Sequence, residues 1–152
     1  MGSNAQSHLR SVPVMERPPD TDVQLTLPAR PENVSVIRHV LGAFAEAMHL
    51  PDELVEDLRL AVTEACTNVV RHAYPPDVPG PVQICIRPME EQVCVVVADR
   101  GRGIGTSSDT TGPGLGLPLI AAIADEVELH PVPGGGSRVT MTFVRHRAGD
   151  AA

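Results

Sequence analysis

Apolar residues recur along this chain with two periods, and the changes between them divide it into elements. Alternation of apolar and polar residues predicts half-buried strands over residues 22–27, 82–87, 92–98, 127–130 and 137–144. Apolar residues three and four apart predict amphipathic helices over 31–48, from 52 to about 73, and from about 114 to 123. The pattern therefore predicts an α/β (α+β) fold.

The strands on either side of residue 90 are expected to form a hairpin with a tight turn around Met89 and Glu90. Their alternate apolar residues then share one face of the sheet, in the expected pairs Val82–Val97, Ile84–Val95 and Ile86–Val93. The period of two puts Asp99 on that same face, at the end of its strand. We therefore expect the Asp99 carboxylate to face the helices.

The two ends of the chain lack this periodicity. Residues 1–20 are expected to be a disordered segment, and residues 147–152 a disordered tail. Residues 2–5 resemble a tag remnant. A chain of 152 residues has room for one core, so we expect a single domain over 21–146.

Composition excludes several classes of function. A net charge of -7 and only three aromatic residues argue against nucleic-acid binding. All the basic residues are arginine, which leaves no lysine for a P-loop, a Schiff base or a kinase of the eukaryotic type. No long apolar run and no signal peptide occur, so we expect a cytoplasmic protein that does not enter a membrane.

The three cysteines are predicted to be free. Cys66, Cys85 and Cys94 show no C-x-x-C spacing and no accompanying histidine pair, which disfavours a zinc site. Cys85 and Cys94 could face each other across the hairpin, but a disulfide is unusual in a reducing compartment. Small buried or half-buried thiols are the expected state.

The second helix carries a candidate for chemistry. Glu64 and Asn68 are four residues apart and share a face, with Asp57 and Arg71 to either side. The carboxylate can accept a proton, and the amide oxygen can bind Mg²⁺. Taken alone, such a pair is more typical of a solvated helix flank.

Two glycine-rich segments change that interpretation. The first, Asp99-Arg100-Gly101-Arg102-Gly103-Ile104, follows a strand; its bare backbone leaves room for a flat ligand, and its carboxylate can accept from an exocyclic amine. The second, Gly112-Pro113-Gly114-Leu115-Gly116, opens the last helix, where free N–H groups favour an anion. Each segment alone could also be a plain glycine turn.

Taken in order, the three segments resemble the nucleotide site of the GHKL ATPase superfamily, which has an N box, a D-x-G-x-G box and a second glycine box. The run E-x-x-x-N-x-x-x-H-A-Y from Glu64 to Tyr74 is similar to the N box of bacterial anti-sigma-factor serine kinases. The resemblance spans about residues 22–144. It implies a Bergerat-type two-layer sandwich, with a mixed, mainly antiparallel sheet and helices on one face.

The resemblance also implies roles for single residues. Asn68 would ligate Mg²⁺, Glu64 would act as general base, and Asp99 would receive the adenine amino group. The rest of the nucleotide-binding set would be Gly101 and Gly103 along the base, Gly114 and Gly116 at the phosphates, and the adjacent Ile104, Gly112 and Leu115. His72 and Tyr74 are expected to be structural, at the helix end.

By this resemblance the protein would bind Mg-ATP, sequester a sigma factor, phosphorylate Ser or Thr of an anti-anti-sigma antagonist, and form a homodimer. The segment between Gly103 and Gly112 departs from the family, because its eight residues include no Arg or Lys to stabilise the γ-phosphate. Arg71, Arg100, Arg102 or a partner's residue could supply that charge.

Three alternatives remain open, and the first of them is favoured by this short lid over the phosphates (residues 104–111). The first is a nucleotide-binding regulatory module of the same fold without kinase activity. The catalytic domain of a sensor histidine kinase is disfavoured, because no phosphoacceptor helix pair precedes residue 22. The last is an α/β interaction domain whose glycines serve only as turns.

Overall fold

The computed structural model describes residues 22–102 and 116–145. Each predicted helix and strand is confirmed, with bounds within two residues of those expected. In chain order the elements are β1 (Val23–Pro28), α2 (Pro31–Ala47), α3 (Asp52–His72), β2 (Pro81–Pro88), β3 (Gln92–Asp99), α4 (Gly116–Ile123), β4 (Glu126–Pro131) and β5 (Ser137–Val144). The predicted tails, 1–20 and 147–152, lie outside the described residues.

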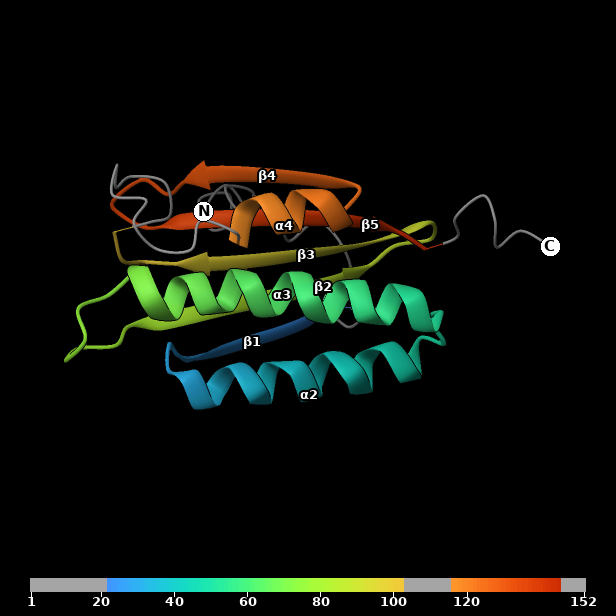
Figure 1. The fold of residues 1–152 in the computed structure, drawn as a ribbon, viewed down its shortest axis with the longest axis horizontal. Helices are drawn as coiled ribbons and strands as arrows, with labels where there is room; N and C mark the ends of the chain where they lie inside the picture. The colour runs from blue at the N-terminus through green and yellow to red at the C-terminus, as the bar shows by residue number, and fades with distance from the viewer. Residues whose placement is uncertain (1–21, 103–115, 146–152) are drawn as a thin grey trace, which may run out of the picture.

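The five strands form one sheet in the order β1-β2-β3-β5-β4, and all neighbouring pairs are antiparallel. A mixed, mainly antiparallel sheet was expected; the antiparallel part is confirmed, and no parallel pair occurs among the described strands. The three helices lie side by side on one face of it (Figure 1). This arrangement confirms the predicted two-layer sandwich.

The β2–β3 hairpin differs from the expected register by two residues. Ile84 pairs with Val97 and Ile86 with Val95, so that Val82 lies opposite Asp99. A shift by an even number of residues leaves every side chain on its original face. The apolar residues therefore line the helix side as expected, and Asp99 is buried there with 2 % of its surface exposed.

Helix α3 is the centre of the helical layer and packs against α2, α4, β3 and β5. It begins with Asp52 and Glu53 and ends with Arg71 and His72, which complement the helix dipole at both ends. Its buried stripe consists of Leu54, Leu58, Ala61, Val62, Ala65, Cys66 and Val69. Burying each larger aliphatic side chain stabilises the fold by about 1.5–3 kcal/mol, so this stripe fixes α3 on the sheet.

Two further predictions can be compared with this fold. All three cysteines are free, with Cys66 buried and Cys85 and Cys94 half-buried. Within 22–102 and 116–145, no helix has the length and hydropathy required to cross a membrane.

Candidate functional site

The predicted acid–amide pair lies on the flank of α3 that faces away from α2. The opposite flank is marked by Arg59, because a Cβ added to Gly42 of α2 would lie 2.5 Å from Arg59 Nη2. At about 100° per residue, Glu64 and Asn68 are rotated by about 140° and 180° from Arg59. Since α3 lies between α2 and α4 (Figure 1), both half-buried side chains are on the α4 side.

Three elements meet near the end of α3. In Figure 1, α3 and β3 both end toward the left, and α4 begins at its left end. The loop after β3 is attached to the helix, because the Arg102 N–H donates to the Ala73 carbonyl oxygen over 2.9 Å. A Cβ added to Gly101 would lie 1.9 Å from that same oxygen, so only glycine permits this approach.

Asp99 is a buried carboxylate that is held on both of its oxygens. Oδ1 accepts the Gly101 N–H and Oδ2 accepts the Ser137 hydroxyl, each over 2.9 Å. Burying an ionised carboxylate is costly unless hydrogen bonds replace its water. Each carboxylate oxygen can accept two hydrogen bonds, so these two bonds leave acceptor capacity for a ligand. The group is therefore fixed in place and still able to receive an amine.

Sequence reasoning missed two residues that shape this site. Ser137 lies directly opposite Asp99 in the β3–β5 ladder, which is how its hydroxyl reaches the carboxylate. Gly136 precedes it with φ +101°, and a Cβ there would lie 2.0 Å from the Asp99 carbonyl oxygen. Two signals could have found them: the run of glycines before the last strand, and the period of two that aligns Ser137 with the buried Val139.

The structure describes only part of the predicted site. Glu64, Asn68, Asp99 and Gly101 are all described, and Gly116 begins α4. The remaining predicted residues, Gly103, Ile104, Gly112, Gly114 and Leu115, lie outside the described residues. Contacts join the Asp99 loop to the end of α3, which is the helix that carries the acid–amide pair.

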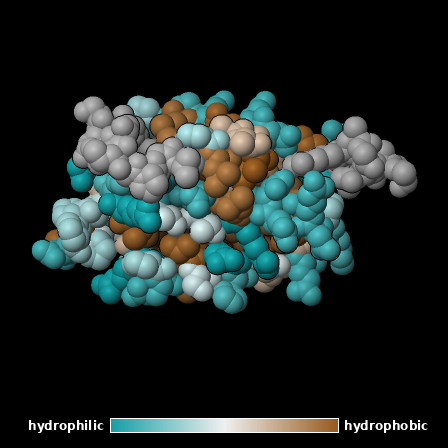
Figure 2. Space-filling view, in the orientation of Figure 1, coloured by the Kyte–Doolittle hydropathy of each residue, from teal (hydrophilic) through white to brown (hydrophobic). Residues whose placement is uncertain are grey.

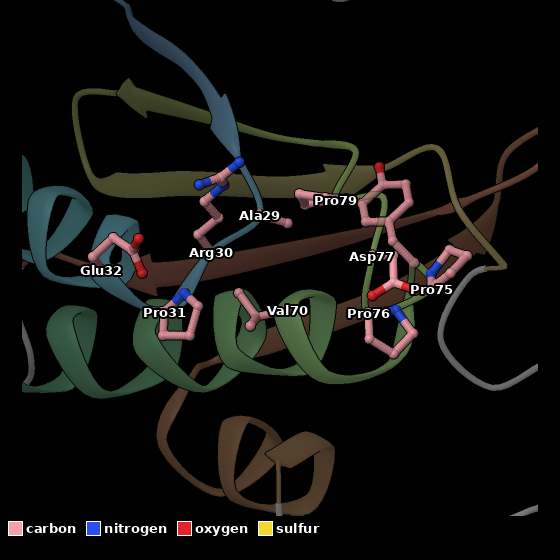
Figure 3. A pocket seen from close by; sticks show the side chains of 10 residues that line it. Ala29, Arg30, Pro31, Glu32, Val70, Pro75, Pro76, Asp77 and Pro79 are labelled. Atoms are coloured by element: carbon pink, nitrogen blue, oxygen red, sulfur yellow. The ribbon is translucent and has the colours of Figure 1, made fainter.

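A separate cavity of about 390 Å³ opens beside the other flank of α3. Figure 3 shows Arg30 and Glu32 near the start of α2 on one side, Pro76 and Asp77 on the other, and Val70 of α3 between them. Because Val70 is on the α2 flank, this cavity is not the predicted nucleotide site. Around it the chain supplies charges of both signs but none of the predicted site residues.

The family profile and the similar known proteins point to the same family. The sequence profile of the histidine kinase-like ATPase domain matches residues 27–143. The serine-protein kinase RsbW of Bacillus licheniformis is 34% identical over 143 residues, which cover 84% of this chain and 89% of that protein. The protein of the same name from Bacillus subtilis is 35% identical and is covered to 87% of its length.

Two solved structures have a similar fold. The crystal structure of the RsbU and RsbW domains of Rv1364c from Mycobacterium tuberculosis matches with a TM-score of 0.67 and 22% identity, over 84% of this chain and 33% of that one. A chain in the crystal structure of the SiaB–SiaC complex from Pseudomonas aeruginosa matches with a TM-score of 0.57 and 15% identity. The match covers 93% of this chain and 96% of that one. At these identities the likeness concerns the fold.

Proposed function

The chain belongs to the histidine kinase-like ATPase domain family, in its branch of anti-sigma serine-protein kinases, and from this premise we propose that it binds Mg-ATP. In this proposal it also holds a sigma factor away from RNA polymerase and phosphorylates Ser or Thr of an anti-anti-sigma antagonist. The observation that carries the ATP part is the environment of Asp99. A buried carboxylate that accepts one backbone N–H and one side-chain hydroxyl, and that keeps acceptor capacity, suits the exocyclic amine of adenine.

The roles proposed for Asn68 and Glu64 follow from the orientation of α3. Asn68 would hold Mg²⁺ through its amide oxygen, since carboxylate, amide and phosphate oxygens are the ligands this ion prefers. Glu64 is four residues away on the same flank and half-buried, within the helix that borders the Asp99 loop. When bound, Mg²⁺ would neutralise charge on the phosphates.

The proposed transfer step uses Glu64 as the base. The hydroxyl oxygen of the antagonist's Ser or Thr would attack the γ-phosphorus, and the bond from that phosphorus to the bridging oxygen would break, releasing ADP. Glu64 would accept the hydroxyl proton. The N–H groups at the start of α4, from Gly116, would contribute positive partial charge toward the phosphates.

The surface beside α3 and α4 suits a protein substrate. Figure 2 shows an apolar area over α4 that continues onto the middle of α3, within an otherwise mostly hydrophilic face. Leu60 of α3 is 41% exposed. Apolar areas bordered by polar residues are typical of protein interaction sites, so this face is proposed to meet the antagonist. We also propose a homodimer, in accordance with the family resemblance.

A nucleotide-binding module without kinase activity is the second candidate, and the short lid favours it. Residues 104–111 contain neither Arg nor Lys, so transfer would depend on Mg²⁺, backbone N–H groups and the exposed Arg71, Arg100 and Arg102.

The two candidates are separated by γ-labelled ATP and a purified anti-anti-sigma protein. Wild type should bind Mg-ATP and label the antagonist. Glu64→Ala should keep Mg-ATP affinity within about twofold, while transfer falls by a factor of about 10²–10⁴, the typical contribution of a general base. Binding without labelling in the wild type would favour the non-catalytic module. Undiminished transfer by E64A would remove Glu64 from its proposed role.

A further inference from the structure

Tyr74, the second residue after α3, joins two chain segments through its hydroxyl. The hydroxyl donates to the Pro81 carbonyl oxygen at the start of β2 over 2.5 Å, and it accepts the Arg100 N–H directly after β3 over 2.8 Å. A phenol has one proton to donate and can accept as well, so both capacities are used. Arg100, which directly follows Asp99, is thereby tied to Tyr74, just beyond the end of α3.

Two glycines lie beside the Tyr74 ring, along its Cδ1–Cε1 edge. A Cβ added to Gly80 would lie 2.3 Å from Tyr74 Cε1, and a Cβ added to Gly101 would lie 3.0 Å from Tyr74 Cδ1. Side chains larger than hydrogen would displace the ring at the first position and crowd it at the second. The ring therefore fits a slot that the backbone leaves open for it.

The loop after β3 is thus held to the end of α3 at three successive residues. Arg100 bonds to the Tyr74 hydroxyl, Gly101 lies against the Ala73 carbonyl, and Arg102 donates to that carbonyl. The middle residue also donates to Asp99 Oδ1. Any movement of this loop relative to the helix would therefore move a donor of the Asp99 carboxylate.

We infer that Tyr74 is a positioning residue for nucleotide binding: it holds the loop after β3 against the end of α3, in the arrangement that presents Asp99 to the base. The inference rests on the proposed function, because it concerns the same nucleotide site. The position of Tyr74 at the helix end predicted only a structural role; the hydroxyl contacts extend that role to the site.

The protonation state of the phenol supports this assignment. Burial raises the pKa of Tyr74 above its usual value; the hydrogen bond from the Arg100 N–H lowers the pKa by less than burial raises it, and the negative charge of Asp99 raises it by a still smaller amount. The hydroxyl therefore keeps its proton near neutral pH and remains a donor to Pro81.

The test variant is Tyr74→Phe, which keeps the ring in its slot and removes only the hydroxyl. We expect the Kd values of Mg-ATP and Mg-ADP to rise by the same factor, about 3- to 10-fold for the loss of one or two ordinary hydrogen bonds. The rate at saturating ATP should stay unchanged, because Glu64 and Asn68 are not altered. Exchange of the Arg100 N–H with deuterium should accelerate.

Asn33→Ala is the matched control. It removes another side-chain-to-backbone bond, from Asn33 Nδ2 to the Pro28 carbonyl over 2.7 Å, near the start of α2. Asn33→Ala should leave both nucleotide Kd values at the wild-type level. A Tyr74→Phe protein that is merely less stable, with wild-type Kd values, would overturn the inference.

Two further outcomes are separable. If wild-type protein fails to bind Mg-ATP, the proposed function fails and the inference fails with it. If Y74F does not fold, exchange in the wild type decides: Mg-ADP binding should slow the Arg100 and Arg102 N–H groups. Unchanged exchange at both N–H groups with nucleotide bound would overturn the inference alone.

Discussion

Asp99→Asn is predicted to separate nucleotide binding from folding. The variant keeps the size of the side chain and replaces one carboxylate oxygen by an NH₂ group. The remaining oxygen can still accept the Gly101 N–H, and the new NH₂ group can donate to the Ser137 hydroxyl oxygen. Because both contacts survive, we expect the free energy of unfolding to stay within about 1 kcal/mol of wild type.

The effect on nucleotide affinity is larger, because the new NH₂ group of D99N and the adenine amine are both hydrogen-bond donors. In the proposed site the adenine amine donates to the carboxylate, and in the variant it would meet either a neutral oxygen or an NH₂ group. A hydrogen bond to a charged acceptor contributes about 1.5–3 kcal/mol. Since about 1.4 kcal/mol is tenfold in Kd, we expect the Kd of Mg-ATP to rise by about 10- to 150-fold.

The assay pairs calorimetry with urea unfolding, and Ser137→Ala is the control. That variant removes the donor to Asp99 Oδ2 but leaves the charge, so it should lower the free energy of unfolding by about 1–3 kcal/mol and weaken Mg-ATP binding less than D99N. A folded D99N protein that binds Mg-ATP within twofold of wild type would refute the assignment of Asp99 to the adenine amine.

Two further predictions concern stability. Gly136→Ala should destabilise more than Gly134→Ala in urea unfolding: both glycines have positive φ, which costs a non-glycine residue about 1–3 kcal/mol, but only at Gly136 does the new Cβ meet backbone. Equal losses would contradict the contact with the Asp99 carbonyl. Burial raises the pKa of Cys66 from its ordinary value of 9.0 to about 12. Between these values the folded state binds more protons than the unfolded state, so the free energy of unfolding should fall as pH rises through that window. The decline, at most about 1.4 kcal/mol per pH unit from this thiol, should be shallower in Cys66→Ala, and parallel curves would count against burial of the thiol.

Periodicity predicted the elements well because it reports directly on burial. The stripe of α3 and the alternation in β2 and β3 were each long enough to fix the type of element and its buried face. The hairpin register was wrong by two residues, and periodicity cannot detect that error, since an even shift leaves the faces unchanged. Turn geometry, with Met89 N–H donating to the Gln92 carbonyl, fixes the register instead.

The order of the strands was not predictable from the same signals. The insertion of β5 between β3 and β4 brings Ser137 opposite Asp99, although 38 residues separate them in the chain. No local pattern encodes such a pairing. The contact of Gly101 with the Ala73 carbonyl was missed for the same reason, because it depends on where the end of α3 lies relative to β3.

Contacts of this kind change what the glycine motifs mean. Sequence reasoning attributed Gly101 to space for a ligand, yet its missing side chain is already required by the Ala73 carbonyl. Gly136 is required by the Asp99 carbonyl in the same way, and Gly80 by the Tyr74 ring. A protein of this fold that had lost nucleotide binding would still need these three glycines in order to fold. It would not need a buried carboxylate at Asp99, which costs free energy to bury, nor an acid at Glu64. On the proposed assignment, the side chains at these two positions, rather than the glycines, would therefore distinguish a kinase from a non-binding relative.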